Sequence, residues 1–335
     1  ARDVAARRDQ PPFAASAMDG YAVCGTDATP GVTLAVIGEA AAGHAYAGSV
    51  SSGEAVRIFT GAPIPDGASR VIIQEDVTRD ADRITLGQNL DRKDHIRPLG
   101  CDFREGQTIT APRRLRPADI ALLASMNVAR VPVRRKPQVA LMSTGDELVM
   151  PGEAPGPDQI IASNTFGLKA LFDAMGADAR ILPIARDTVA SLTAGFALTR
   201  GADLIITIGG ASVGDHDLVG RVAGDLGMER AFYKVAMRPG KPLMAGRLNG
   251  AAMVGLPGNP VSAMVCGHVF IAPMINAMLG LGTAPAPRLR APLAVPLPPN
   301  GPREHYMRAA LTPQGIHPED KQDSSLLSIL ANAEA

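Results

Sequence analysis

The sequence predicts a multidomain protein of the α/β and β classes, with a doubly wound, mostly parallel α/β domain at its centre. Three observations lead to this prediction. Apolar strands alternate with amphipathic helices from residue 138 onward, a Gly-, Thr- and Val-rich region precedes them, and a Pro-rich region with strand-like runs follows. The 335 residues are enough for roughly two to four domains of the usual size.

The segment from residue 25 to residue 99 is predicted to form an inserted β-rich domain. Its short alternating runs, such as Val32 to Ile37 and Arg70 to Val77, are separated by turn clusters such as the one from Ala62 to Gly67. Alternation with a period of two is typical of half-buried strands. We therefore expect a compact β domain here.

The residues on both sides of this insert, 1–24 and 100–134, are predicted to form a mixed domain. A helix is expected over 117–126, because Pro117 suits the first helical position and Ile120, Leu123 and Met126 recur on one face. The basic segment RVPVRRKP that follows has the composition of a linker.

Strands and helices alternate through the central α/β domain, residues 135–283. This alternation implies right-handed crossovers and a mostly parallel sheet with helices on both faces. In such a sheet ligands bind at the carboxyl ends of the strands. The strands are expected at 138–143, 180–184, 204–208, 232–235, 243–247 and 251–255, and the helices at 163–175, 188–199, near 216–226 and from residue 260 onward.

Residues 284–335 are predicted to form a further small β domain. The stretch after Leu281 is Pro-rich, with short strand-like runs and one candidate helix before Ala335. Too few residues follow to close a small barrel or sandwich, so we expect this domain to be incomplete. The first residues, ARDVAARRDQPPF, lack an initiator Met and likewise resemble the middle of a longer segment.

Composition predicts a cytoplasmic protein with no nucleic-acid or membrane partner. The 33 basic and 33 acidic residues balance, so any anion site must be local. Cys24, Cys101 and Cys266 form no CxxC pair, which argues against a disulfide framework and fits a reducing compartment. No signal-peptide pattern is present, and the longest apolar stretch, near Met264 to Leu281, contains His268 and is predicted to be a buried helix.

The first of three candidate loops follows the strand at 138–143. Thr144 and Gly145 turn out of an apolar strand, and Asp146 and Glu147 follow as two adjacent carboxylates. Adjacent acids are costly there unless they act on a ligand. A solvated turn with a helix-capping acid explains this loop equally well on its own.

The second loop, GGASVGDHD, follows the strand at 204–208. Gly209 and Gly210 allow the backbone to turn tightly past a ligand, and Ser212 offers a hydroxyl. Gly214 opens a helix whose first amides could hold a phosphate. The two aspartates that follow are typical of a Mg²⁺ site beside a phosphate. The alternative is an ordinary Gly-rich connection with acids at the start of a helix.

The third loop follows the strand at 251–255. Asn259 can cap the long helix, Pro260 suits its first position, and Ser262 lies in its first turn, where an oxyanion could bind.

A basic segment, FYKVAMRPGKPL, lies between the second and third loops. Lys234, Arg238 and Lys241 are spaced by four and three residues, and the prolines and glycine between them break regular structure. This segment is therefore predicted to be a loop that delivers cations. Three cations on a neutral chain suggest an anionic ligand.

Several well-known motifs are absent. The chain has no GxxxxGK[ST] and no GxGxxG after a strand, so neither a P-loop kinase nor a dinucleotide dehydrogenase is favoured. The six His residues show no HExxH spacing. Gly210 to Gly214 reads GxSxG, but no acid and base in a suitable order support a hydrolase.

Seven ordered motifs together resemble one family, the molybdenum insertases that include MoeA, the gephyrin E domain and its plant counterpart. The motifs span nearly the whole chain, and chance agreement over all seven is negligible. They are PPFAASAMDGYAV, RIFTGAPIPDGASRVIIQEDV, STGDEL, SNTFGLKALFDAMGA, TIGGASVGDHD, KVAMRPGKP and GLPGNPVSA.

The resemblance implies a transferase that inserts molybdate into adenylated molybdopterin and releases AMP, with Mg²⁺ as cofactor. The implied catalytic residues are Asp19, Thr60, Glu147, Asp187, Asp217, Lys234 and Lys241. The implied metal-holding residues are Glu147, Asp187, Asp215 and Asp217. The residues assigned to the pterin phosphate and molybdate include the glycines of the second loop. They are Gly209, Gly210, Ser212, Gly214, Arg238, Pro242, Ser262, Arg303, Arg308, Ser324 and Ser325.

The chemistry of these residues agrees with that reaction. Cleaving a phosphoanhydride develops negative charge, which Mg²⁺ and the basic loop can stabilise. Arg238 stands where many members carry Lys, which keeps the charge and alters the geometry.

The resemblance also implies a homodimer acting on small molecules. Its cleft would lie between the α/β domain of one subunit and the N-terminal domains of the other, with transient contacts to molybdopterin adenylyltransferase and to molybdoenzymes. Two other functions stay open: a catalytically weak scaffold of the gephyrin E-domain type, and molybdopterin adenylyltransferase itself, against which the N-terminal motifs argue. Tungstate in place of molybdate is open as well.

Overall fold

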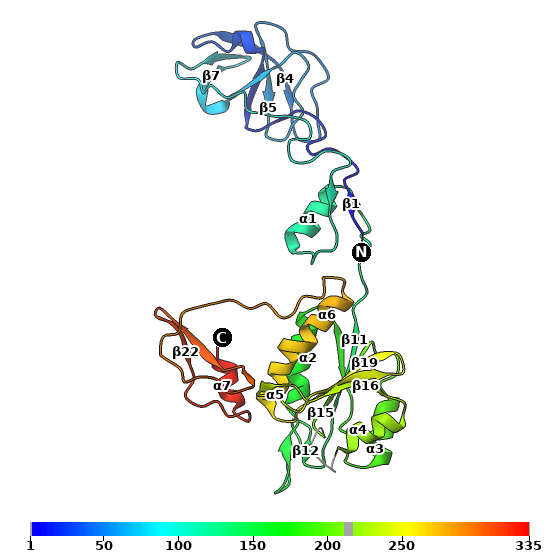
Figure 1. Cartoon of the computed structure of the whole chain (residues 1–335). Helices are drawn as coiled ribbons and strands as arrows, with labels where there is room; N and C mark the ends of the chain where they lie inside the picture. Colours follow the sequence, from blue (N-terminus) through cyan, green and yellow to red (C-terminus); the bar gives the residue numbers. More distant parts are fainter. Residues whose placement is uncertain (1, 211–216, 335) are drawn as a thin grey trace. The chain divides into compact units, whose positions relative to one another are not determined.

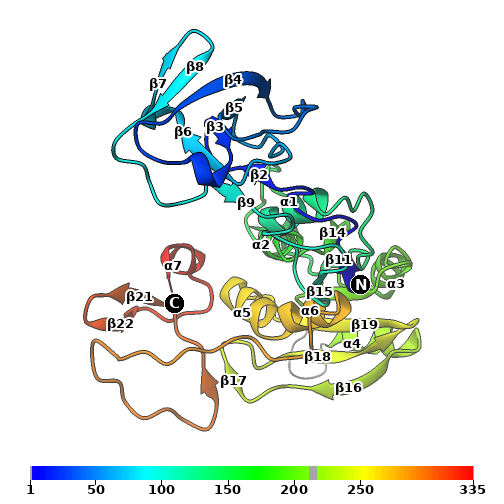
Figure 2. The ribbon, with the colours of Figure 1, turned by 90° about the horizontal axis from the view of Figure 1, so that it is seen from above.

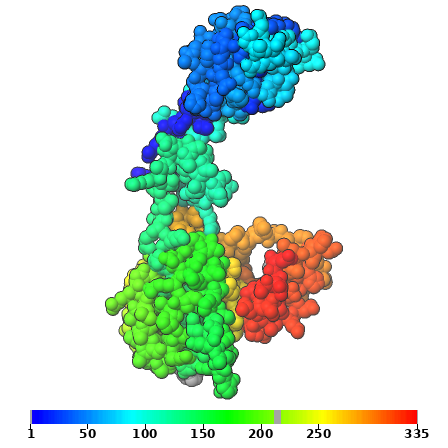
Figure 3. All heavy atoms as spheres, turned by 180° about the vertical axis from the view of Figure 1, so that it is seen from behind, coloured from blue at the N-terminus to red at the C-terminus, as the bar shows by residue number. Residues whose placement is uncertain are grey.

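The computed structural model describes residues 2–210 and 217–334 of the chain. The chain divides into two compact units, Ala1–Val133 and Arg134–Ala335 (Figure 1, Figure 3). The boundary between them falls inside the predicted linker RVPVRRKP.

The first unit contains a six-stranded sheet in the order β6-β3-β5-β4-β8-β7 (Figure 2). Neighbouring residues of β3 face opposite sides, because Tyr21 and Val23 belong to one apolar cluster and Ala22 belongs to the other. β3 joins this sheet although it precedes residue 25. The strands are β3 (Gly20–Val23), β4 (Thr33–Ala40), β5 (Glu54–Ile58), β6 (Arg70–Ile73), β7 (Val77–Asp80) and β8 (Arg83–Leu86).

One strand of this sheet was predicted to be continuous and is interrupted in the structure. The run from Arg70 to Val77 breaks at the 3-10 helix η2 (Gln74–Asp76). Glu75 and Asp76 lie in its first turn, a position that favours acids over a continued strand. A second 3-10 helix, η1 (Gly25–Asp27), follows β3.

The rest of the first unit is held by short strand pairs and one helix. β1 (Val4–Ala5) pairs with β10 (Thr108–Ile109), and β2 (Ala15–Ser16) pairs with β9 (Ile96–Arg97). Helix α1 (Pro117–Ser125) begins at the predicted proline, and the carboxylate of Asp119 accepts a hydrogen bond from the Arg116 amide at 2.9 Å.

The predicted apolar face of α1 is wrong at one position. Leu123 and Met126 are buried in a cluster with Ala6 and Phe103, whereas Ile120 is 52% exposed. The cluster packs against the last turn of this short helix, and the first-turn isoleucine stays half exposed.

The second unit is built on a six-stranded sheet in the order β14-β11-β15-β19-β18-β16. The first four strands are parallel, and β18 runs antiparallel to both of its neighbours, β19 and β16, which confirms the predicted mostly parallel sheet. The strands are β11 (Gln138–Ser143), β14 (Asp178–Ile181), β15 (Leu204–Ile208), β16 (Glu229–Tyr233), β18 (Met244–Leu248) and β19 (Ala251–Leu256).

Helices cover both faces of this sheet, as predicted (Figure 1). Val139 and Leu141 of β11 face α2, α5 and α6, whereas Ala140 and Met142 face α3 and α4. Burial on both faces explains why β11 and β15 are mostly apolar. The helices are α2 (Asn164–Ala174), α3 (Val189–Ala197), α4 (Leu218–Asp225), α5 (Pro260–Cys266) and α6 (Ala272–Met278).

The long helix from Pro260 is continuous and mostly apolar, with a π-helical turn (Gly267–Ile271) between α5 and α6. Its length and composition alone would allow it to cross a membrane. Cys266, Ile271 and Ile275, however, are fully buried against the sheet. The helix is thus a core helix, as the sequence predicted.

Two strand predictions are shifted along the chain. The strand expected at 180–184 is β14, which ends at Ile181, and the strand expected at 232–235 is β16, which ends at Tyr233. Pro183 cannot donate a ladder hydrogen bond, and Lys234 has φ +73, a left-handed conformation that ends a strand.

The C-terminal residues form small strand pairs beside the α/β part (Figure 3). β17 (Met237–Arg238) pairs with β20 (Glu304–His305), and β21 (Ala309–Thr312) forms a hairpin with β22 (Gly315–Pro318). Helix α7 (Leu327–Asn332) follows. A short parallel pair, β12 (Leu148–Val149) and β13 (Ile160–Ile161), extends from the loop after β11.

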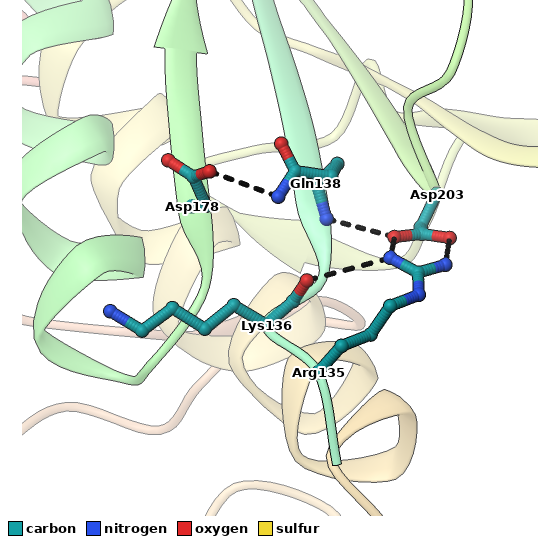
Figure 4. Close-up of polar contacts among 5 residues, drawn as sticks. All are labelled: Arg135, Lys136, Gln138, Asp178 and Asp203. Carbon is teal, nitrogen blue, oxygen red and sulfur yellow. Dashed lines mark hydrogen bonds and ion pairs between the residues drawn. The ribbon is translucent and has the colours of Figure 1, made fainter.

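A polar cluster fixes the linker to the amino edge of the central sheet (Figure 4). The Arg135 guanidinium binds both oxygens of Asp203 at 2.6 and 2.5 Å. Asp203 also accepts the Gln138 amide at 2.8 Å, and the Gln138 side chain donates to Asp178 at 2.9 Å. These contacts set where β11 begins.

Replacing Asp203 with Ala is expected to cost about 1 kcal/mol of unfolding free energy at pH 7, since the pair is largely solvent-exposed. The hydrogen bonds from Arg135 lower the pKa of Asp203 from its ordinary 3.8. The pKa of Asp203 is lower in the folded state than in the unfolded state. The stabilisation by its carboxylate is therefore fully present above the unfolded-state pKa and is lost as the pH falls through the folded-state pKa. Urea unfolding of wild type, Asp203→Ala and the loop variant Asp158→Ala checks this. A difference that persists unchanged at pH 2 would contradict it.

Candidate active site

A hollow of about 660 Å³ lies at the carboxyl edge of the central sheet. The chain runs from β11 to β14 on one side and then to β15 on the other, so the β11/β15 crevice is a topological switch point, where open α/β sheets bind ligands. The walls come from all three predicted loops, from β12, β13 and the start of α2, and from the C-terminal segment. They include Thr144, Glu147, Ile160, Asn164, Gly209, Gly210, Pro242, Gly258, Asn259 and Ser325.

The floor of the hollow consists of tightly packed backbone. The Thr144 amide donates to the Ile208 carbonyl at 2.9 Å. Gly209 has φ +92, and a Cβ there would lie 2.6 Å from the Thr144 carbonyl oxygen. Gly210 has φ +64, and a Cβ there would lie 2.3 Å from Val219 Cγ2 and 2.8 Å from Thr144 Oγ1. Both positions require glycine, as the second loop predicted.

Replacing Gly210 with Ala is therefore expected to destabilise the fold by about 2 kcal/mol, through overpacking and left-handed strain. It should also narrow the hollow, because the new methyl group would stand beside the Thr144 hydroxyl. Gly224→Ala in α4 is the matched control, since nothing lies within 4 Å of its added methyl and alanine favours helix. Urea unfolding of both variants tests this. Equal stability of the two would refute it.

Three carboxylates gather beside the hollow. Glu147 lines it, and the Asp187 amide donates to the Asp146 carboxylate at 3.1 Å. The pKa of Asp187 is raised, first by burial and then by repulsion from Asp146 and Glu147. The structure thus brings together two of the implied metal-holding residues and adds Asp146 to them.

Arg186 clamps the loop that carries these acids. Its Nη1 donates to the carbonyls of Gly145 at 3.3 Å, Asp146 at 3.0 Å and Leu148 at 2.9 Å. The Arg186 amide in turn donates to the Ser191 hydroxyl at 2.9 Å. Sequence reasoning missed Arg186, because its three partners are backbone atoms some 40 residues away that leave no pattern in the sequence.

The acidic cluster has the donor chemistry of a hard cation site. Within residues 2–210 and 217–334, no three His, Cys, Asp or Glu side chains stand arranged to hold a metal ion. Oxygen ligands nevertheless suit Mg²⁺, and a cation would relieve the repulsion that raises the pKa of Asp187. These residues fit the ion by charge and chemistry.

Asp217 has a second explanation in the structure. It is the N-cap of α4, and its carboxylate accepts the Gly220 amide at 2.9 Å. This is the alternative that the sequence left open for an acid at the start of that helix. Ser212, Gly214 and Asp215 lie outside the described residues.

The basic segment is a loop, as predicted, and it borders the hollow. Its base is closed by the Lys234 amide, which donates to the Leu243 carbonyl at 2.8 Å, and by the Val235 amide, which donates to the Lys241 carbonyl at 3.1 Å. Pro242 lines the hollow itself. The side chains of Lys234, Arg238 and Lys241 are exposed.

Strand pairing brings further cations to this loop. β17 and β20 place Arg238 opposite His305. The pKa of His305 is lowered, first by burial and then by Arg238, Arg308 and Arg303. Arg238 and Arg303, which are far apart in sequence, are thus neighbours around a histidine that sequence reasoning had not selected.

Comparison with known proteins decides the family. Three family models match: the MoeA N-terminal region (domain I and II) over residues 1–127, a probable molybdopterin binding domain over 140–277, and the MoeA C-terminal region (domain IV) over 290–335. The molybdopterin molybdenumtransferase of Haemophilus influenzae is 38% identical over 84% of this chain and 70% of its own length. Molybdopterin molybdenumtransferase 2 of Mycobacterium tuberculosis is 39% identical over 93% and 80%. The chain belongs to the molybdopterin molybdenumtransferase family.

Solved structures agree with this family fold. The molybdopterin biosynthesis MoeA protein from Pyrococcus horikoshii superposes with a TM-score of 0.79 at 29% identity, covering 100% of this chain and 85% of that one. Another solved structure, described as a molybdopterin biosynthesis MoeA protein from Pyrococcus horikoshii OT3, has the same fold, with a TM-score of 0.78 at 24% identity over 99% of this chain and 84% of that one. The family and the fold class predicted from the sequence are confirmed. Members of this family are transferases of molybdenum cofactor biosynthesis.

The C-terminal segment reaches the family's α/β domain through Ser324. Its carbonyl accepts the Val261 amide at 3.0 Å, and its hydroxyl lies 3.0 Å from Asn259 Nδ2, which donates to it. Asn259 is the N-cap residue of α5, as predicted, but its side chain makes no capping hydrogen bond and donates to Ser324 instead. Ser325 lines the hollow, whereas Ser262 is buried in α5 and does not.

Arg308 and Arg303 have different surroundings within this C-terminal region. Arg308 is 2% exposed, and its Nη2 donates to the carbonyls of Lys321 at 2.9 Å and Asp323 at 3.0 Å. Burial lowers its pKa. Arg308 thus holds the loop before Ser324, while Arg303 is exposed.

The two predicted residues of the first unit contact each other. The Thr60 amide and hydroxyl both donate to Asp19 Oδ1, at 2.7 and 2.8 Å. These two hydrogen bonds lower the pKa of Asp19, with Arg57 contributing further. Arg57 is a second residue that sequence reasoning missed. It stacks on Tyr21 and Phe59 and donates to the Gly20 carbonyl.

Proposed function

We propose that this chain inserts molybdate into adenylated molybdopterin and releases AMP in a Mg²⁺-dependent reaction. The observation that carries the proposal is the hollow at the β11/β15 switch point, where an acidic loop, a glycine floor and a basic loop meet in a member of this family. Relatives named molybdopterin molybdenumtransferase support it. The match of residues 1–127 and 290–335 to MoeA regions supports an insertase over the adenylyltransferase alternative.

Each part of the hollow has a role in this proposal. Gly209 and Gly210 let the phosphate approach the backbone, and Lys241, beside the lining residue Pro242, attracts the oxyanions. Glu147 and Asp187 orient the reacting groups and would hold the metal with Asp146. When bound, Mg²⁺ would stabilise negative charge that develops on the phosphoanhydride.

The remaining residues are assigned by the same proposal. Arg238, Arg303 and Ser324 would contribute to molybdate binding, Arg308 and Ser262 would support the segments beside it, and Lys234 and Asp217 would complete the cleft. Ser212, Gly214 and Asp215 would do so as well.

We further propose a cytoplasmic homodimer, in which Asp19 and Thr60 serve the hollow of the partner subunit. The chain would meet the adenylyltransferase and molybdoenzymes only transiently. The four-part division at residues 24, 99, 134 and 283 belongs to this proposal, except that β3 (Gly20–Val23) goes with the inserted β domain whose sheet it joins. The separate cluster of Ala6, Phe103 and Leu123 supports the division.

The test is AMP release from adenylated molybdopterin by the full chain, with and without Mg²⁺ and molybdate. Release that requires both is the expected result, and tungstate in a parallel arm measures the preference for the oxyanion. If a folded preparation binds adenylated molybdopterin yet releases no AMP, the insertase function is refuted and a scaffold of the gephyrin E-domain type becomes the better description.

A further inference from the structure

Two threonine hydroxyls on neighbouring parallel strands are buried without a hydrogen-bond partner. Thr144, directly after β11, is 1% exposed, and Thr207 in β15 is 0% exposed. Neither Oγ1 atom has a partner among the residues that the structure describes. Most buried side-chain polar atoms in proteins are hydrogen-bonded, so each of these hydroxyls requires an explanation.

The two hydroxyls have different surroundings. Thr207 lies within the sheet, where a Cβ on Gly255 would stand 3.2 Å from its Oγ1, and it does not line the hollow. Thr144 lines the hollow at the switch point. Thr207 is therefore surrounded by the residues of the sheet, whereas Thr144 also borders a space that a ligand could enter.

The space beside Thr144 is kept open by a glycine. A Cβ on Gly210 would stand 2.8 Å from Thr144 Oγ1, so any side chain there would cover the hydroxyl. Glycine at position 210 therefore adds no side chain over the hydroxyl, which is itself buried. A ligand atom that enters the hollow could complete the hydrogen bond that none of the described residues supplies.

The composition of the walls indicates which part of a ligand would reach Thr144. Leu148, Ile160 and Ile161 give the hollow apolar lining in addition to the glycine floor. Backbone amides and glycines approach phosphates closely in many nucleotide sites, whereas a ring system prefers the apolar wall. An oxygen of a phosphate group is the acceptor that suits the floor.

We propose that the Thr144 hydroxyl donates a hydrogen bond to a phosphate oxygen of adenylated molybdopterin at the β11/β15 switch point. Thr144 is then a ligand-contacting residue whose hydroxyl has no partner among the described residues and is paired by the bound substrate. This inference rests on the proposed function, because that function supplies the phosphate.

Three variants of the full chain test this proposal. Thr144→Val removes the hydroxyl and keeps the shape, Thr144→Ser keeps the hydroxyl, and Thr207→Val removes the equivalent hydroxyl outside the hollow. The measurements are the thermal midpoint without ligand and the Kd for adenylated molybdopterin, with Mg²⁺ present and molybdate omitted.

The expected pattern separates binding from folding. Both valine variants should melt higher than wild type by roughly 2–6 °C, because each removes an unsatisfied buried hydroxyl. Only Thr144→Val should weaken binding, by about 10- to 100-fold, the loss expected for one hydrogen bond to a charged group. Thr144→Ser should stay within about threefold of wild type.

Either of two results would overturn the proposal. If Thr144→Val binds as tightly as wild type, the hydroxyl does not contact the substrate. If Thr144→Val melts lower than wild type, the hydroxyl serves the fold. Failure of wild type itself to bind adenylated molybdopterin would refute the proposed function instead, so the two failures are distinguishable.

Discussion

Glu147→Gln is expected to lower Mg²⁺-dependent AMP release by on the order of 100-fold, with no loss of stability. Glu147 lines the hollow, and its charge contributes to the raised pKa of Asp187. Removing one of three clustered negative charges weakens the attraction for a cation and also relieves repulsion within the fold. Steady-state AMP release at several Mg²⁺ concentrations and a thermal melt measure both effects.

Glu153→Gln is the matched control for this variant. Glu153 is an exposed acid in the loop between β12 and β13, and its carboxylate accepts the Met150 amide at 2.9 Å. Its release rate should stay within about twofold of wild type, as expected for a surface position. Wild-type rates in Glu147→Gln at low Mg²⁺ would exclude Glu147 from the proposed metal site.

The sequence predicted best those elements that are buried on both faces. The bounds predicted for β11 and β15 agree with the structure at both ends, because each strand is a mostly apolar run that is followed within two residues by a glycine. Pro260 and Pro117 marked the first positions of α5 and α1 for a local steric reason. Local chemistry was sufficient in these cases.

Tertiary contacts account for what the sequence could not predict. The side chain of Asn259 suits a cap, yet it makes no capping hydrogen bond. Its Nδ2 donates instead to Ser324, 65 residues away. Asp217 suits both a cap and a metal ligand, and only the structure shows its bond to the Gly220 amide. Ile120 fits the helical period of α1, but its side chain is half exposed, because the apolar cluster packs against the last turn of the helix.

The candidate site shows the same division. The glycines and acids of the three loops could be selected because their residue types are informative by themselves. Arg186 could not, because its role depends on carbonyl groups that every residue has. His305 was missed because its arginine neighbours are brought to it by the pairing of β17 with β20.

Arg186→Ala is expected to lower AMP release by about 10- to 100-fold while the protein stays folded, because misplaced groups cost rate steeply. The change removes all three hydrogen bonds from Nη1 to the loop that carries Asp146 and Glu147. It also removes a positive charge, which by itself would strengthen Mg²⁺ binding. A weaker apparent affinity for Mg²⁺ therefore identifies loss of loop position as the cause.

Amide hydrogen exchange gives a second readout that does not depend on substrate. In Arg186→Ala, the amides of residues 145–148 should exchange faster, whereas those of β11 should not change. Arg186→Lys keeps the charge and three donors on one nitrogen, so it should restore part of both properties. Arg180→Ala is the control, because Arg180 donates to the Arg200 carbonyl at 3.1 Å, outside the acidic loop. Unchanged exchange in Arg186→Ala would show that this arginine does not hold the loop, and any loss of activity would then come from its charge.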